Sequence, residues 1–159
     1  MTGQATDRNE TRDERADRNF GELLQELRVI ETGVQVLFSV LLTVPFSQRF
    51  DQVTGLQRDV YFAALVLAAV SSVLIIAPAT YHRVLFQKGE KPRIVRVSNR
   101  LALAGTIFLW LSMTAVLLLV SDVLFHGTAA VIVATTFGAA TGLLWFVPPL
   151  VRRLEDERR

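Results

Sequence analysis

The stretch VYFAALVLAAVSSVLIIAPATY, residues 60–81, contains no charged residue. Apolar side chains run through it almost without interruption, whereas a helix in a soluble protein would carry them as a stripe. An α-helix needs ~20 such residues to cross a bilayer core of ~30 Å. Similar apolar runs occupy residues 29–46, 101–121 and 127–151. The sequence therefore predicts a protein that crosses a membrane four times.

The chain has 159 residues, of which 51% are hydrophobic, so it has room for one helical domain and two tails. We expect an all-α integral membrane four-helix bundle over residues 20–151. Its helices should cover about residues 20–50, 59–83, 97–121 and 127–151. Residues 152–159 should form a charged cytoplasmic tail.

The first 19 residues are polar and carry charges of both signs. Such a segment cannot bury enough apolar surface to fold alone, so we expect a disordered cytoplasmic tail and no cleaved signal peptide. Asn19 and Glu22 have the spacing of a capping box. Apolar residues then recur at the spacing of one helix face, at Phe20, Leu23, Leu24 and Leu27. This pattern predicts an interfacial amphipathic helix that leads into the first span.

Lysine and arginine residues alternate between the segments that flank the runs. The counts are 5, 2, 6, 0 and 4 from the N-terminal to the C-terminal segment. Cytoplasmic loops carry the excess of these residues. Both termini and the loop around residues 82–100 should therefore face the cytoplasm.

The first span carries polar residues at four-residue spacing. Glu31, Gln35, Ser39 and Thr43 share one helix face, and Thr32 borders it. Polar side chains are costly in hydrocarbon, so we expect this face to contact other helices or water. Helix packing and an ion path both fit the pattern.

Glu31 is the only carboxylate within the four runs, and it lies near the predicted cytoplasmic end of its span. The predicted topology places His82, Arg100 and Arg152 at the same level. A structural ion pair at this cytoplasmic mouth is the favoured interpretation. A titrating pair of Glu31 and His82 would instead be a proton entry.

The fourth run carries small residues four positions apart, at Ala130, Ala134, Gly138 and Gly142. Such a ridge allows two helix backbones to approach closely. A weaker ridge, Ala64, Ala68 and Ser72, lies in the second run. Each ridge could pack inside the bundle or between subunits.

The first and third runs begin with the same pattern, an arginine followed five positions later by a glycine. These residues are Arg28 and Gly33 in the first run and Arg100 and Gly105 in the third. The shared spacing raises the question of whether the two hairpins arose by duplication. Parallel repeats of this kind occur in transporters.

Signatures of catalysis and of cofactor binding are missing from the sequence. It contains no HExxH, GxSxG or phosphate-binding glycine loop, and it contains no cysteine. We therefore expect no enzyme activity, no cofactor, no metal site and no nucleic-acid partner. Membrane lipids are the expected surroundings, and the protein partner is either a second copy or another membrane protein.

Several segments together resemble a known family. They are LLQELRVIETGVQVLFSVLLTVPF at residues 23–46, Gln57-Arg58, Ala77-Pro78 followed by His82-Arg83, and residues 100–105. The family consists of small bacterial four-span membrane proteins and is classed as a domain of unknown function. Its members often carry the name sodium:proton antiporter. The resemblance covers roughly residues 20–125 and implies a multi-pass protein of the bacterial plasma membrane.

Two functions are expected on these grounds. The favoured one is a non-catalytic structural or accessory membrane component. The alternative is ion or proton transport, antiporter-like or channel-like, by an oligomer that uses the polar face of the first helix.

Overall fold

The computed structural model describes residues 12–48, 50–85, 91–125 and 127–156. Four long helices dominate it, and two short 3₁₀ helices lie between the first two. Their bounds are α1 Arg12–Thr43, η1 Val44–Phe46, η2 Phe50–Gln52, α2 Gly55–Leu85, α3 Lys91–Phe125 and α4 Thr128–Asp156. Each long helix contains a stretch that is long and apolar enough to cross a membrane. The predicted all-α membrane bundle is confirmed.

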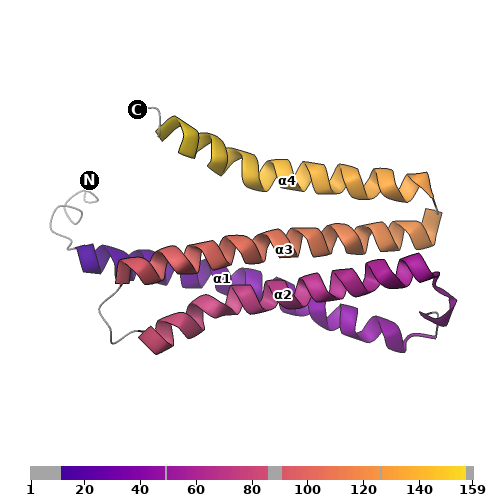
Figure 1. Cartoon of the computed structure of the whole chain (residues 1–159), viewed down its shortest axis with the longest axis horizontal. Helices are drawn as coiled ribbons and strands as arrows, with labels where there is room; N and C mark the ends of the chain where they lie inside the picture. The colour runs from indigo at the N-terminus through magenta and orange to yellow at the C-terminus, as the bar shows by residue number, and fades with distance from the viewer. Residues whose placement is uncertain (1–11, 49, 86–90, 126, 157–159) are drawn as a thin grey trace, which may run out of the picture.

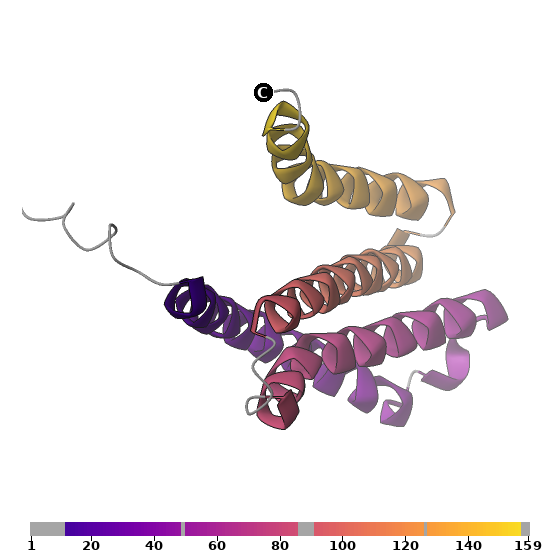
Figure 2. The ribbon, with the colours of Figure 1, turned by 60° about the vertical axis from the view of Figure 1, so that its left-hand side comes forward.

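Helix α3 is the centre of the bundle, because it contacts α1, α2 and α4. Consecutive helices run antiparallel, so both ends of the described chain lie at one end of the molecule (Figure 1). We call this the basic end, and we call the opposite one, with η1 and η2, the distal end. Helix α4 contacts only α3 among the described elements, and it stands apart from α1 and α2 in both ribbon views (Figures 1 and 2).

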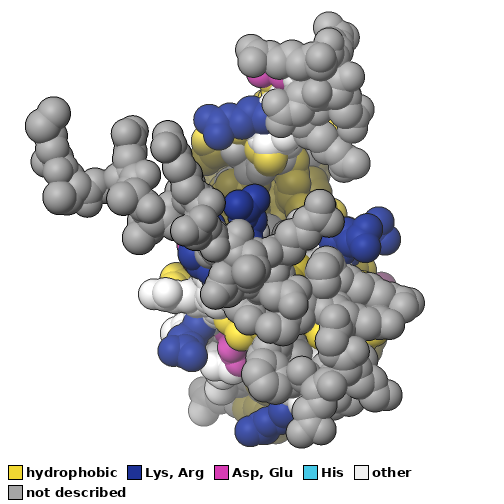
Figure 3. Space-filling model, turned by 90° about the vertical axis from the view of Figure 1, so that its left-hand side faces the viewer, with side chains coloured by type: hydrophobic (Ala, Val, Ile, Leu, Met, Phe, Trp, Pro, Cys, Tyr) yellow, Lys and Arg dark blue, Asp and Glu magenta, His cyan; other side chains and the backbone are white. Residues whose placement is uncertain are grey.

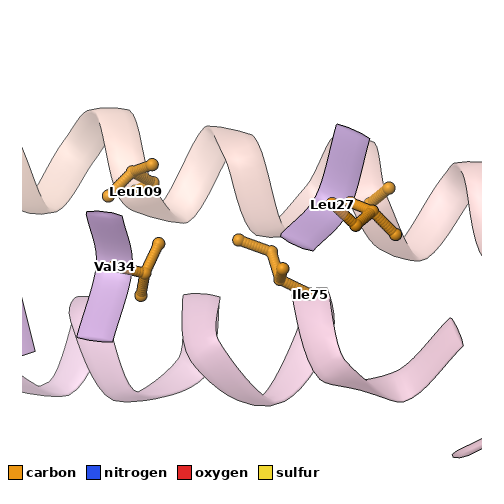
Figure 4. Close-up of a cluster of buried hydrophobic side chains, with 5 residues drawn as sticks. Leu27, Val34, Ile75 and Leu109 are labelled. Atoms are coloured by element: carbon orange, nitrogen blue, oxygen red, sulfur yellow. The ribbon is translucent and has the colours of Figure 1, made fainter. Parts of the chain in front are cut away.

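The main core lies where α1 fits against α2 and α3. Leu27 and Val34 of α1 meet Ile75 of α2 and Leu109 of α3, with Ala102 in the same cluster (Figure 4). Leu27, Val34 and Leu41 are seven residues apart and all buried, as expected when two turns of a helix return to the same face.

Large apolar side chains cover the outer surface of the spans. Val73 of α2 is 68% exposed and Leu144 of α4 is 70% exposed, in the middle of apolar stretches. A soluble protein rarely leaves such contiguous apolar surface in water. Lipid is the solvent that fits this surface, so the protein is a multi-pass membrane protein.

Helix α1 begins earlier than the sequence predicted. Residues 12–19 are helical, so their predicted disorder is wrong, and Asn19 lies inside the helix and does not cap it. Arginine and glutamate are good helix formers, so the charged residues of this segment favour a helix. Residues 1–11 of the predicted tail lie outside the described residues.

The amphipathic segment that the sequence predicted is helical and continuous with the first span. Phe20 and Leu27 are buried, and Leu23 packs against the main core. The apolar side chains of this segment therefore contribute to protein packing.

Prolines lie inside two of the helices, Pro78 in α2 and both Pro148 and Pro149 in α4. A proline removes a backbone N–H and bends a helix. Helix α4 turns away from α3 toward its C-terminal end, where its prolines lie (Figure 1). This bend increases the separation between α4 and the rest of the bundle at the basic end.

Candidate functional site

The polar face of α1 points away from the bundle. Thr32, Gln35, Ser39 and Thr43 are exposed, and Glu31 is half-buried. The apolar stripe of the same helix faces α2 and α3 instead. Burying the apolar stripe turns the polar face outward, so this face does not pack against α2 or α3 in the described chain. Its expected contact with other helices or water stays a prediction.

Local hydrogen bonds satisfy most of this face. Thr32 Oγ1 donates to Arg28 O at 3.0 Å, Ser39 Oγ to Gln35 O at 2.7 Å, and Thr43 Oγ1 to Val40 O at 2.7 Å. Such bonds to the preceding turn are the usual way for a hydroxyl to sit on a helix without a partner helix. Gln35 is the exception among the neutral residues, because its second N–H and its oxygen have no partner among the described residues.

Glu31 bonds within its own helix. Gln35 Nε2 donates to Glu31 Oε1 at 3.1 Å. No ion pair joins Glu31 to Arg100 or Arg152 among the side chains that the structure describes, and Arg152 belongs to α4, which does not contact α1. The described side chains therefore do not show the predicted pairing with these two arginines, which stays a prediction, and the side chain of His82 lies outside the described residues.

The basic end carries its arginines on the surface. The exposed members whose side chains are described are Arg15, Arg18, Arg28, Arg83, Arg96, Arg100 and Arg152. The view onto this end shows Lys and Arg side chains spread around its edge (Figure 3). Such exposed cations suit the headgroup layer of a membrane.

The small-residue ridge of α4 packs against α3. Ala130, Ala134 and Gly138 are buried, and a Cβ atom at Gly138 would lie 3.1 Å from Thr114 Cγ2. Trp110 Nε1 donates to Gly138 O and to Thr141 Oγ1, both at 3.0 Å. A Cβ at Gly142 would meet the Trp110 ring at 3.1 Å. The sequence allowed this ridge to pack either inside the bundle or between subunits, and the structure shows it packed inside the bundle.

The α2 ridge also faces α3, and hydrogen bonds from two serines stabilise the contact. Ser71 Oγ donates to Gly105 O, and Ser112 Oγ donates to Ala64 O, each at 2.8 Å. Ala64 and Ala68 are fully buried. Gly105 is buried in this contact, whereas Gly33, its counterpart in the apparent repeat, is exposed and has open space where a Cβ would be.

A hydrogen-bond network at the distal end joins α2, α3 and the turn that precedes α4. Thr54 and Gln57 form a reciprocal capping box at the start of α2, with bonds of 3.2 Å and 3.0 Å. Gln57 Nε2 also donates to Asp122 Oδ2 at 2.9 Å, and Asp122 Oδ1 accepts from Gly127 N at 3.2 Å. Sequence reasoning missed this network, although the spacing of Thr54 and Gln57 before an apolar run was a visible signal.

Beside this network lies a cavity of about 340 Å³. Helix α1 starts near α3 at the basic end and passes behind α2, so α1 and α3 lie apart at the distal end (Figure 1). The cavity fills the space between them and has almost entirely apolar walls. Its lining includes Leu37, Val40, Leu41, Val44, Tyr61, Val116, Leu119 and Val120. No sequence pattern pointed to this cavity, because its walls come from three helices and a loop.

Comparisons with known proteins place the chain in a family without giving it an activity. Neither the curated proteins nor the solved structures contain a match to this chain. The model of one protein family matches residues 9–149, which is most of the sequence. The chain therefore belongs to that family, a family of unknown function (DUF6328).

Proposed function

We propose that this protein is a non-catalytic structural or accessory component of a bacterial plasma membrane, and that it assembles through the polar face of α1. The single observation that carries the proposal is the outward position of this face. Thr32, Gln35, Ser39 and Thr43 lie on the exposed side of a helix whose apolar stripe is buried.

The surroundings of this polar face determine which hydrogen-bond partners it requires. Residues 18–46 contain the first membrane-spanning stretch, so lipid would meet the face in a single copy. Hydrocarbon offers no hydrogen bonds, and the amide of Gln35 still has a donor and an acceptor to satisfy. Small side chains such as Thr32 and Ser39 let a second helix approach closely. A polar helix is therefore the partner that fits.

A second copy of this chain meets that requirement. All copies insert in the same direction, so two α1 helices would lie parallel about an axis along the membrane normal, with Gln35 of each at the same depth. An amide both donates and accepts, so two Gln35 side chains can satisfy each other. Polar bonds between membrane helices average only about 0.6 kcal/mol, so we expect a moderate affinity.

Disulfide crosslinking tests the assembly, since the natural chain contains no cysteine. Ser39→Cys should give a crosslinked dimer in native membranes. Thr135→Cys is the matched control, because Thr135 of α4 is also an exposed hydroxyl bonded to its preceding turn. Adding Gln35→Leu to Ser39→Cys should lower the yield of crosslinked dimer. Equal crosslinking at both positions would contradict the proposal.

Ion or proton transport by the oligomer is the second candidate, and the length of the polar face favours it. From Glu31 to Thr43 the face extends about 18 Å at 1.5 Å per residue, more than half of a bilayer core. Several copies with these faces turned inward would surround a polar path. Flux from liposomes that depends on pH and is lost in Glu31→Gln would favour transport over the accessory role.

A further inference from the structure

The cavity at the distal end is a second feature of this molecule that the proposed assembly through α1 does not use. It is lined by Leu37 and Val40 of α1, by Val116 and Val120 of α3, and by the Tyr61 ring of α2. Along α3 the lining runs from Val116 to Leu124, about 12 Å at 1.5 Å per residue. A volume of about 340 Å³ lies at the lower limit of ordinary small-molecule sites, which begin at about 300 Å³.

Two of the polar side chains at the wall already form hydrogen bonds within the protein. Tyr61 donates its hydroxyl to Leu41 O at 2.6 Å. Gln57 uses its oxygen for Thr54 N and its nitrogen for Asp122. The second N–H of Gln57 and the hydroxyl of Ser47 have no partner among the described residues, and both lie at the distal margin of the cavity. The interior of the cavity is therefore apolar, and apolar spaces of this kind do not hold water. What enters the cavity has to be hydrocarbon.

The way into the cavity lies on the surface that faces lipid. Val40 is 56% exposed and Val120 is 47% exposed, and both line the cavity. They belong to the apolar stretches of α1 and α3 that cross the membrane. The cavity is thus continuous with the lipid-facing surface, and Ser47 and Gln57 mark its polar margin at the distal end.

From this geometry we infer that the cavity holds one acyl chain of a membrane phospholipid, with the headgroup at the level of Ser47 and Gln57. The chain completes the packing between α1 and α3 where these helices lie apart. Its site is separate from the outward polar face of α1, so the inference does not depend on the proposed assembly. Recognition is by shape and apolar contact, so chain length should matter more than headgroup type.

Photocrosslinking of the full chain tests the inference. The protein is reconstituted in phosphatidylcholine vesicles that contain some phosphatidylcholine with a diazirine in one acyl chain. It is then transferred to detergent and irradiated, and the adducts are located by peptide mass spectrometry. We expect adducts to persist near Val40 and Val120, whereas adducts on the exposed face of α4 near Ile132 should disappear. Equal loss at both places would overturn the inference.

Variants separate a bound chain from nonspecific contact. Val116→Phe adds volume inside the cavity and should reduce its adducts about tenfold, since each buried methylene group contributes substantially to affinity. Val123→Phe at the exposed margin should also reduce the adducts, and it places no larger side chain in the core. Val131→Phe, an equal change at an exposed position of α4, should have no effect. Full labelling in both cavity variants, with the fold retained by thermal melting, would overturn the inference.

A second copy of the chain could instead cover the cavity. In that case the lipid probe would be excluded, and the peptides around Val40 and Val120 would carry no adduct even before transfer to detergent. This outcome would refute the lipid site and would leave the crosslinking test at Ser39 unaffected.

Discussion

Gln57 and Asp122 lie 65 positions apart in the sequence, and Gln57 Nε2 donates to Asp122 Oδ2 across 2.9 Å. This bond ties the first turn of α2 to the last turns of α3. Because Asp122 also accepts from Gly127 N, one carboxylate connects the start of α2, the end of α3 and the turn before α4. Asp122 lies within the third spanning stretch, one residue beyond the end that the sequence predicted for this helix.

Removal of this carboxylate should destabilise the fold. Asp122→Ala leaves the Gln57 amide without its partner, and a hydrogen bond to a charged group contributes about 1.5–3 kcal/mol. We expect a loss of about 2 kcal/mol in the free energy of unfolding, measured by denaturant titration in detergent. Asp59→Ala is the control, because Asp59 is exposed at the same end. Equal stability of both variants would show that the network contributes nothing.

Gly105 should tolerate no side chain. A Cβ there would lie 2.7 Å from Ile75 Cγ1 and 3.3 Å from Leu74 Cβ. Gly105→Ala should therefore lower the unfolding free energy by about 1–3 kcal/mol through overpacking. Gly33→Ala meets nothing within 4 Å, and it should stabilise the helix by about 0.5–1 kcal/mol. Opposite signs in the two melting temperatures are the expected result, and equal shifts would contradict the packing of α2 on α3.

Gly138→Ile should separate α4 from α3. The added side chain would replace close contact with Thr114 and disturb the bond from Trp110 Nε1. Because α3 is the only described element that α4 contacts, loss of this contact should reduce the thermal stability of the monomer itself. Ala139→Ile is the control, since Ala139 is exposed beside it. Dissociation of an oligomer with an unchanged monomer melt would show that the ridge packs between subunits.

The orientation in the membrane remains a prediction from the lysine and arginine count. Single cysteines at Gly55 and Thr128, both exposed at the distal end, should react with an impermeant thiol reagent added to intact cells. A cysteine at Arg96, which is exposed at the basic end, should not react. Labelling at Arg96 from outside would reverse the predicted topology.

The sequence by itself determined that this is a four-span helical membrane protein. Backbone hydrogen bonds in lipid must be satisfied within each segment, so four apolar runs of sufficient length require four helices. The ridge at Gly138 could also be predicted, because small residues at four-residue spacing allow close backbone contact whatever the partner. Helix ends were predicted less well, since charged residues such as those at 12–19 continue a helix outside the apolar layer.

Only the tertiary structure decided which side of each helix faces protein. Helix α1 has both an apolar stripe through Val34 and a polar face through Ser39, and each could have packed inward. Val34 is buried because α2 and α3 offer it an apolar cluster, while the hydroxyl of Ser39 is satisfied by its own helix. The distal cavity depends on the way α1 crosses α2 (Figure 1). Such a space arises from the angle between helices, and no residue pattern within one helix encodes that angle.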